Sequence, residues 1–196
     1  MLSSEQILYI QGRIARFNDQ HAYKELFTGL YNYLFTFARS LVREKEAAEE
    51  IVSDVFIMVW EKRKDLERIE NLKVYLYVST RNMAFNYLEK EKRSATDSLE
   101  GVPANLTSVY LDPEQLLITA DMIALIQKAI SQLPPKCRMI FKLAKEDGLK
   151  YREVAEVLNI SVKTVENQLA IALHKIGSTV SFDIRKAVSS SVGHHP

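Results

Sequence analysis

Apolar side chains recur every three or four residues through most of residues 20–92 of this chain. The clearest runs are Phe27, Leu30, Leu34 and Phe37, then Ile51, Val55 and Val59, then Leu72, Leu76 and Met83. Residues at this spacing share one face of an α-helix, so each run gives a helix an apolar stripe. The pattern predicts three or four packed helices in this part of the chain.

The periodicity fades between Ser94 and Asp112, where serine, threonine, asparagine, glycine and proline accumulate. These residues favour turns and irregular backbone. We therefore predict a flexible linker over residues 94–112.

A second set of helices is predicted after the linker. Its first helix carries Leu116, Ile123, Ile126 and Ile130. Pro134 and Pro135 end this helix, because proline lacks the amide donor that a helix interior requires. The later apolar positions predict helices over residues 137–144, 151–158 and 162–176, with Gly148 at a helix end.

The chain is therefore predicted to be all-α, with two small helical domains. We expect the first over residues 1–93, the linker over 94–112, the second over 113–180 and a frayed tail over 181–196. Composition agrees with this fold class, because six glycines and five prolines in 196 residues leave few tight turns for an all-β chain.

Cysteine content and hydropathy indicate where the chain works. Cys137 is the only cysteine, which excludes an intramolecular disulfide and argues against a thiolate zinc site. Residues 1–10 lack the basic start and long apolar run of a signal peptide, and the longest apolar run, residues 55–60, is too short to cross a bilayer. We expect a soluble cytoplasmic protein without direct membrane insertion.

Charge alternates along the chain, although the formal net charge is only +1. Residues 41–60 carry a local net charge of −3, residues 94–121 carry −5 without any lysine or arginine, and residues 136–186 carry +4. A nucleic-acid-binding protein needs a local basic surface rather than a basic total. The alternation favours more than one kind of partner, and it makes the predicted linker acidic.

Residues 151–169 (YREVAEVLNISVKTVENQL) have the pattern of a helix-turn-helix. Val154, Ala155 and Leu158 are expected to face inward on the first helix, and Asn159 suits the turn because asparagine tolerates a left-handed backbone. Ser161 suits the N-cap of the second helix. In this motif the second helix enters the major groove of DNA.

The second helix of the motif is predicted to have one buried and one DNA-facing side. Val165, Leu169, Ala172 and Ile176 form its apolar stripe. The candidate DNA-contacting residues lie opposite or beside that stripe: Ser161, Lys163, Thr164, Asn167, Gln168, Ala170 and His174. Lysine can contact phosphate or guanine, and asparagine can hold adenine with two hydrogen bonds. An ordinary helical hairpin with a solvated polar face is the alternative.

Glu46, Glu50 and Asp54 are spaced four residues apart and line one face of a predicted helix. Carboxylates stacked on a single helix diverge into solvent, and neither a histidine nor a second acidic cluster accompanies them, so we expect no metal site. The remaining interpretations are a solvated face and a docking face for a basic partner.

Four segments, in this order, resemble extracytoplasmic-function sigma factors of the sigma-70 family. Residues 48–60 (AEEIVSDVFIMVW) look like region 2.2, an acidic helix ending in tryptophan. Residues 71–88 (NLKVYLYVSTRNMAFNYL), with a basic exit at 90–93, look like regions 2.3 and 2.4. Residues 133–141 (LPPKCRMIF) resemble region 4.1, and the helix-turn-helix resembles region 4.2.

The helix-turn-helix also differs from many members of that family. Residues 162–166 (VKTVE) look like the Bacteroidetes branch. Glu166, Asn167 and Gln168 stand where many members carry Lys-Ser-Arg, so the phosphate contacts and base preference are expected to differ.

The resemblance implies that the acidic helix docks on core RNA polymerase, at the β′ clamp helices, and that the β flap is a further contact. The residues it implicates in polymerase binding are Glu46, Glu50, Asp54, Phe56 and Trp60. Opposite charges would attract the two partners.

The resemblance also implies two promoter contacts. The −35 element would be read as duplex by the helix-turn-helix. The −10 element would be opened and held as a single strand by Lys73, Tyr75, Tyr77, Arg81, Asn82 and Phe85. Aromatic stacking and cationic contacts hold single strands in general, although some of these aromatic residues must belong to the core.

The predicted function is therefore that of a sigma factor, which is not an enzyme and uses no cofactor or small-molecule substrate. An anti-sigma factor is an expected further partner, and the acidic linker is expected to occupy the channel that later accepts RNA. A stand-alone helix-turn-helix regulator is the alternative function, but it leaves the acidic helix ending at Trp60 unexplained. A metal-dependent nuclease is a third hypothesis, and it predicts cleavage of DNA with Mg²⁺ or Mn²⁺.

Overall fold

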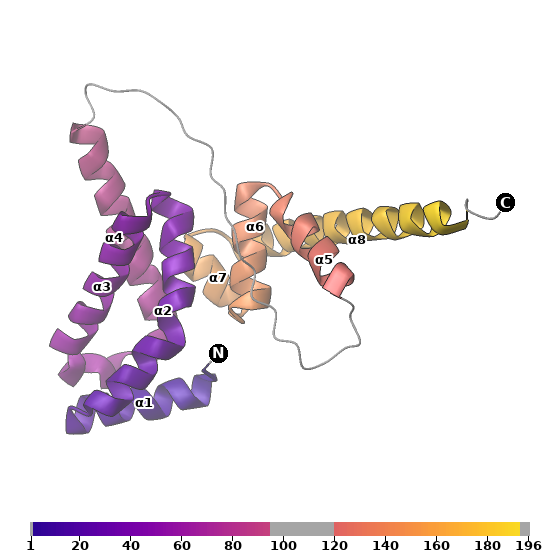
Figure 1. Cartoon of the computed structure of the whole chain (residues 1–196). Coiled ribbons are helices and arrows are strands. Elements are labelled where there is room, and N and C mark those ends of the chain that lie inside the picture. The colour runs from indigo at the N-terminus through magenta and orange to yellow at the C-terminus, as the bar shows by residue number, and fades with distance from the viewer. Residues whose placement is uncertain (1, 95–119, 193–196) are drawn as a thin grey trace. The chain divides into compact units, whose positions relative to one another are not determined.

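The computed structural model describes residues 2–94 and 120–192, and every regular element within them is helical (Figure 1). The first range holds α1 (Ser4–Phe17), α2 (Gln20–Val42), α3 (Lys45–Glu61), the 3₁₀-helix η1 (Arg63–Arg68) and α4 (Leu72–Ser94). The second holds α5 (Ala120–Ser131), α6 (Pro135–Phe141), the π-helical turn η2 (Lys142–Glu146), α7 (Tyr151–Leu158) and α8 (Val162–Val192). The predicted all-α fold class is confirmed.

The chain divides into two compact units, as the sequence predicted. Helices α1 to α4 form the first, and α5, α6, α8 and most of α7 belong to the second. The predicted linker lies outside the described residues except for Ser94, the last residue of α4, and so does Leu116, where we expected the following helix to continue.

Helices α2, α3 and α4 pack together around the core of the first unit, and α1 runs across one end of them (Figure 1). The predicted stripe of α3 is buried, with Ile51, Val55 and Val59 at most 5% exposed. On α2 the buried stripe includes Leu30, Leu34 and Phe37 as predicted, whereas Phe27 is half-buried and the neighbouring Leu26 is buried instead.

Helix α1 is an element that the sequence patterns above did not include. The side-chain oxygen of Ser3 accepts a hydrogen bond from the backbone N–H of Gln6, and the Gln6 side chain accepts one from the backbone N–H of Ser3. This reciprocal capping box starts the helix. Ile7, Ile10 and Ile14 then give it a buried face at helical spacing. Both signals are present in the sequence.

The second unit has its own core. Ile130, Leu133, Cys137 and Ala172 are buried together, and Ile126, Phe141 and Ile176 pack against them. Pro135 occupies the first turn of α6, where a missing N–H costs nothing. Gly148 has a φ of +63°, a left-handed conformation that favours glycine after a helix, which agrees with its predicted place at a helix end.

The C-terminal helix is longer than predicted. We expected fraying from Ser181, but α8 continues to Val192. Neither glycine nor proline occurs between Gly177 and Gly193, so no residue in that stretch breaks the helix. Residues 193–196 of the predicted tail lie outside the described residues.

Asp19 starts α2 and ties it to α1. Its carboxylate accepts hydrogen bonds from the backbone N–H groups of His21 and Ala22 at 2.9 and 3.1 Å, and the Arg13 guanidinium lies 2.7 Å away. The hydrogen bond from Ala22 and then the bond from Arg13 lower the pKa of Asp19 below its ordinary value. The ionised carboxylate is therefore the form that stabilises the first unit.

Asp19→Asn should lower the stability of the chain at neutral pH and hardly change it in acid. Folding lowers the pKa of Asp19. The ionised carboxylate therefore contributes its full stabilisation above the unfolded-state pKa of about 4, and this stabilisation is lost as pH falls through the folded-state pKa. Asparagine retains a capping oxygen, so the comparison isolates the charge. Urea unfolding from about pH 7 down to about pH 3 measures the difference; a difference that stays constant over that range would contradict the assignment.

Candidate partner and nucleic-acid interfaces

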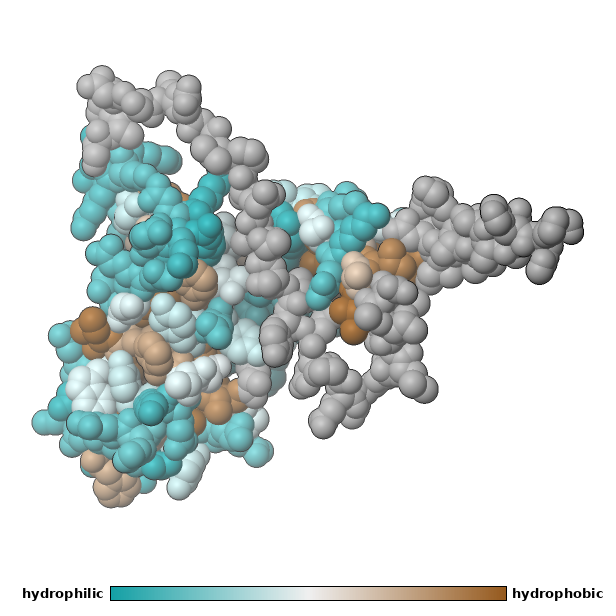
Figure 2. Space-filling model, viewed as in Figure 1, coloured by the Kyte–Doolittle hydropathy of each residue, from teal (hydrophilic) through white to brown (hydrophobic). Residues whose placement is uncertain are grey.

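Helix α3 presents an acidic face to solvent. Glu46, Glu50 and Asp54 are all exposed, because the opposite side of the helix is buried against α2 and α4. Figure 2 shows hydrophilic residues over much of the first unit, interrupted by small apolar patches. The structure therefore brings together the three carboxylates that the sequence placed on one face.

Negative charge near this face raises the pKa of a tyrosine at its edge. The hydroxyl of Tyr87 on α4 donates a 2.8 Å hydrogen bond to the Glu44 carboxylate. That bond, together with burial and the nearby charges of Glu44, Glu91 and Glu50, raises the pKa of Tyr87 to about 12. Negative charge on this side of the unit thus exceeds the three residues that the sequence singled out.

Ile57 is an apolar residue on this acidic face that we did not predict from the sequence. Its side chain is 54% exposed, and it follows Asp54 by three residues on α3. Residues three apart are neighbours on a helix surface. In the sequence Ile57 alternates with Val55 and Val59 and has the same apolar character. Only a helical projection shows that it lies away from the buried stripe. The acidic face of α3 therefore also carries one exposed apolar side chain.

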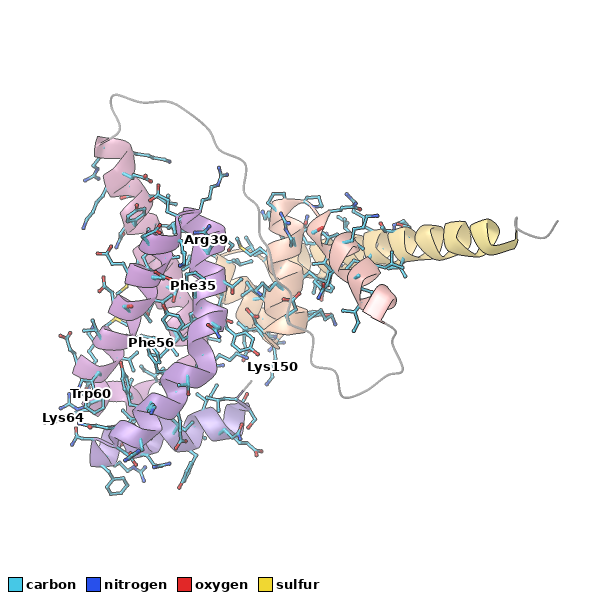
Figure 3. The ribbon with its side chains drawn as sticks, viewed as in Figure 1. Phe35, Arg39, Phe56, Trp60, Lys64 and Lys150 are labelled. Atoms are coloured by element: carbon cyan, nitrogen blue, oxygen red, sulfur yellow. The ribbon has the colours of Figure 1, made fainter. Side chains whose placement is uncertain are left out.

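The predicted aromatic contacts at the end of α3 have different environments. Phe56 is only 1% exposed and packs on Phe27 with ring centroids 4.8 Å apart, so it belongs to the core rather than to the surface. Trp60 is half-buried; its ring lies 5.0 Å from Tyr23 and carries the Arg63 guanidinium at 4.8 Å. Figure 3 shows both side chains on α3. Trp60 is therefore accessible to a partner, whereas Phe56 supports the helix from inside.

Tyr77 does not occupy the surface that we predicted for it. It is 1% exposed, and its ring packs on Phe37 at 5.3 Å. A ring enclosed in this way cannot stack on a base, so the prediction that Tyr77 contacts DNA is corrected to a core role. The sequence could not separate the two roles, because Tyr75 and Tyr77 are both aromatic and only their direction from α4 differs.

Arg81, Asn82 and Phe85 lie on one side of α4, away from the buried face of Leu76, Thr80 and Ala84. Phe85 is 50% exposed. The guanidinium of Arg81 donates to the Asn82 side-chain oxygen from Nε at 3.2 Å and from Nη2 at 2.9 Å. These bonds orient a cation on the same side of α4 as the exposed Phe85 ring, and proteins that bind single-stranded nucleic acid typically combine cations with aromatic rings.

The other two residues of the predicted −10 group lie in the first turn of α4. Lys73 and Tyr75 are both half-buried. The Tyr75 hydroxyl lies 3.8 Å from the Met58 sulfur on α3, which fixes the direction of its ring. Tyr75 is not fully enclosed, so its predicted contact with DNA stays a prediction.

The helix-turn-helix is formed by α7 and α8, as predicted. Asn159 has a φ of +53°, the left-handed conformation expected of the turn. The Ser161 side-chain oxygen accepts a 3.0 Å hydrogen bond from the backbone N–H of Thr164, which caps α8. Val154 and Ala155 are buried on α7, but Val157 is fully buried where we expected Leu158, which is half-buried.

The two sides of α8 separate as predicted. Val165, Leu169 and Ala172 are at most 2% exposed and Ile176 is half-buried. The predicted DNA-contacting residues fall into two groups by exposure: Ser161, Lys163, Asn167, Ala170 and His174 are exposed, and Thr164 and Gln168 are half-buried. The exposed group includes the two side chains with the clearest base-reading chemistry, Lys163 and Asn167.

Two contacts involve residues of the predicted DNA-contacting side of α8. The Lys163 ammonium lies 3.5 Å from the Glu166 carboxylate, an exposed pair that DNA phosphate can replace because such pairs are weak. The Cys137 thiol on α6 donates to the backbone oxygen of Gln168, which places that residue at the border with the core. Burial raises the pKa of Cys137, against an opposing effect of Lys175, so the thiol form is favoured.

The described residues offer neither a metal cluster nor a membrane span. Among them, His, Cys, Asp and Glu side chains nowhere gather in groups of three or more that could hold a metal ion. None of the helices in the described ranges combines the length and apolar character needed to cross a membrane.

Two family models match the chain, one in each unit. The model described as Sigma-70 region 2 matches residues 26–94, and the model described as Sigma-70, region 4 matches residues 123–176. The first match contains the acidic face of α3 and the exposed residues of α4, and the second contains the helix-turn-helix. Together they cover more than half of the 196 residues.

Curated relatives of the chain are named as RNA polymerase sigma factors. A protein named "Probable RNA polymerase sigma factor RfaY" from Xanthomonas campestris pv. campestris is 27% identical over 159 residues, which are 78% of this chain and 39% of that protein. The protein named "ECF RNA polymerase sigma-E factor" from Escherichia coli K12 is 26% identical over 144 residues, 70% of this chain and 75% of that protein. The chain thus spans well under half of the first relative and three quarters of the second.

Two solved structures share the fold. One is the sigma factor RpoE with the anti-sigma factor NepR from Bartonella quintana, with a TM-score of 0.56 and 24% identity over 82% of this chain and 97% of the matched chain. The other is CnrH with the cytosolic domain of CnrY, with a TM-score of 0.54 and 18% identity over 91% of this chain and 99% of the matched chain. With region 2 and region 4 matched in order and relatives of the same type, the chain belongs to the sigma-70 family and is a sigma factor of the extracytoplasmic-function (ECF) type.

Proposed function

We propose that this chain recruits core RNA polymerase to a restricted set of promoters and helps to open them, without performing covalent chemistry itself. The observation that carries the proposal is the presence, on one chain, of an exposed acidic face on α3 and an exposed polar face on α8, the second helix of the helix-turn-helix. A stand-alone helix-turn-helix regulator would use the second face but would have no need of the first.

Polymerase binding is assigned to the acidic face of α3. Glu46, Glu50 and Asp54 supply exposed negative charge, and Ile57 supplies an apolar anchor among them. A basic helical partner such as the β′ clamp helices fits this chemistry, because charge steers the encounter and a central apolar contact holds the complex. Trp60, with Arg63 on its ring, lies at the C-terminal end of α3.

Promoter binding is assigned to α4 and α8. On α4 the accessible group of Arg81, Asn82 and Phe85 would hold the −10 element as a single strand. On α8 Lys163 and Asn167 would read the −35 element in the major groove. Strand opening would then be driven by binding energy alone, which agrees with the family's lack of enzymatic activity.

We also propose that an anti-sigma factor binds this chain. Two fold relatives were solved as complexes, RpoE with the anti-sigma factor NepR and CnrH with the cytosolic domain of CnrY.

The β flap as a second polymerase contact, the Bacteroidetes branch and a cytoplasmic location stay predictions from the sequence. The Bacteroidetes branch is supported by the resemblance of residues 162–166 to that branch.

Asp54→Lys should weaken binding to core polymerase by reversing the field on the acidic face, and the loss should shrink as salt is raised because exposed charges are screened. Fluorescence anisotropy of the labelled chain with purified core enzyme at low and high salt measures both effects. Glu5→Lys, the same charge change on α1, is the matched control. Unchanged affinity of the Asp54 variant would remove that residue from the interface.

Ile57→Ala should weaken core binding by about fivefold or more, because truncating a central apolar contact commonly costs above about 1 kcal/mol. The loss should appear as faster dissociation and should be the same at low and high salt, in contrast to the Asp54 variant. Leu8→Ala removes a similarly exposed leucine, 63% accessible, from α1 and should have no effect. Dissociation of the Ile57 variant at the wild-type rate would show that the residue is simply solvated.

Asn167→Ala should reduce the preference for the −35 sequence by about 1 to 3 kcal/mol, because a side chain that reads a base edge is lost while phosphate contacts stay. Duplex binding to the specific site and to a scrambled site, compared at one salt concentration, gives the ratio. Lys175→Ala, on the same helix, should change both affinities alike. An equal loss on both duplexes for the Asn167 variant would make Asn167 a positioning contact.

A further inference from the structure

Gln11 is one of three buried polar residues in the described parts of the chain, at 3% exposure. Its side-chain amide points from α1 to the segment between α3 and α4. Nε2 donates hydrogen bonds to the backbone oxygens of Leu66 at 2.5 Å and Ile69 at 2.7 Å. One amide group therefore uses both of its N–H bonds on one short stretch of backbone.

These two carbonyls lie at the C-terminal end of η1, where helix carbonyls run out of partners within the helix. Leu66 lies in the last turn of the 3₁₀-helix η1, and its oxygen accepts one hydrogen bond from the backbone, from the N–H of Ile69 at 2.9 Å. The last carbonyls of a helix need such outside donors, and a buried carbonyl without one is costly. Leu66 itself is fully buried, so water cannot easily replace the amide. Gln11 thus fixes the path of the chain through residues 66–69.

A second tether joins the same two elements at the surface. Arg16, near the end of α1, forms an ion pair with Glu67 on η1. Both side chains are largely exposed, so the pair is weak by itself, but it acts on the residue next to Leu66. Both tethers come from α1, which precedes the residues matched by the region 2 model.

The tethered segment leads directly into the predicted −10 surface. Asn71 starts α4: its side-chain oxygen accepts from the N–H of Val74 at 3.1 Å and its backbone oxygen from the N–H of Tyr75 at 3.0 Å. Lys73 and Tyr75 occupy that first turn. Only Glu70 separates Ile69 from Asn71, so a shift of the Ile69 carbonyl moves the cap and the first turn with it.

We propose that Gln11 is a positioning residue for binding of the single-stranded −10 element, acting through the Leu66–Asn71 backbone on the first turn of α4. The inference rests on the proposed function, because it assumes that α4 contacts that strand. It adds a role for α1, whose residues would never touch DNA or polymerase.

The test compares Gln11→Met with Gln6→Met in the full chain bound to core polymerase. Methionine keeps the length of the side chain and removes the N–H donors. Gln6 belongs to the exposed capping box of the same helix and does not reach η1, so its variant controls for any general weakening of α1. The probes are a single-stranded oligonucleotide carrying the −10 element of a promoter that the wild-type holoenzyme transcribes, and a duplex carrying its −35 element.

Gln11→Met should lower affinity for the single strand by about tenfold, in line with the loss of buried hydrogen bonds, and leave core and −35 affinity unchanged. Gln6→Met should leave all three affinities unchanged, even if it lowers the unfolding temperature. If the Gln11 variant binds the single strand as the Gln6 variant does, or loses all three affinities together, the positioning role is overturned. A wild-type chain that binds neither core nor promoter would refute the proposed function itself.

A charge exchange keeps the idea testable if Gln11→Met does not fold. Arg16→Glu and Glu67→Arg should each lower affinity for the single strand by about twofold, and the double variant, which restores an opposite-charge pair, should recover it. Recovery in the double variant supports the bracing of residues 66–71 by α1. Single variants that match the wild type, or a double variant no better than either, would overturn it.

Discussion

The structure depends on one constraint: each functional helix must bury one stripe of apolar side chains, and this burial decides which polar residues face outward. On α3 the buried residues are Ile51, Val55 and Val59. Their burial turns Glu46, Glu50 and Asp54, on the opposite side of the helix, toward solvent. On α8 the burial of Val165, Leu169 and Ala172 does the same for Lys163 and Asn167. The two proposed binding faces are therefore consequences of the two hydrophobic cores, and the hydrogen bonds at Asp19, Asn71 and Ser161 fix where the helices begin.

The helical periodicity was sufficient to predict the fold class, the two units and both faces, because 3.6-residue spacing relates sequence to direction wherever a helix is regular. The acidic face of α3 and the exposed side of α8 agree with the sequence for this reason, as do the left-handed Asn159 and the cap at Ser161. The length of α8 was underestimated, since the three consecutive serines at 189–191 and the two terminal histidines suggested fraying although residues 178–192 contain neither glycine nor proline.

Periodicity fails where a residue type has two roles or where a contact joins distant segments. Tyr77 and Phe56 have the chemistry of a binding aromatic residue, and only their packing on Phe37 and Phe27 assigns them to the core. Ile57 differs from these two, because its apolar side chain suggests a core residue whereas its position on a helical projection already separates it from the buried stripe. Gln11 could not have been found at all, because its partners are carbonyls 55 and 58 residues away and a backbone oxygen has no sequence signature.

Run-off transcription with purified core polymerase on fragmented genomic DNA measures the central claim most directly, since it requires both faces to work together on one chain. If they do, adding the protein produces transcripts with new start sites from a small set of fragments, and core enzyme alone does not produce them. Transcripts identical with and without the protein, from a preparation in which it is folded and present in excess over core enzyme, would contradict that claim.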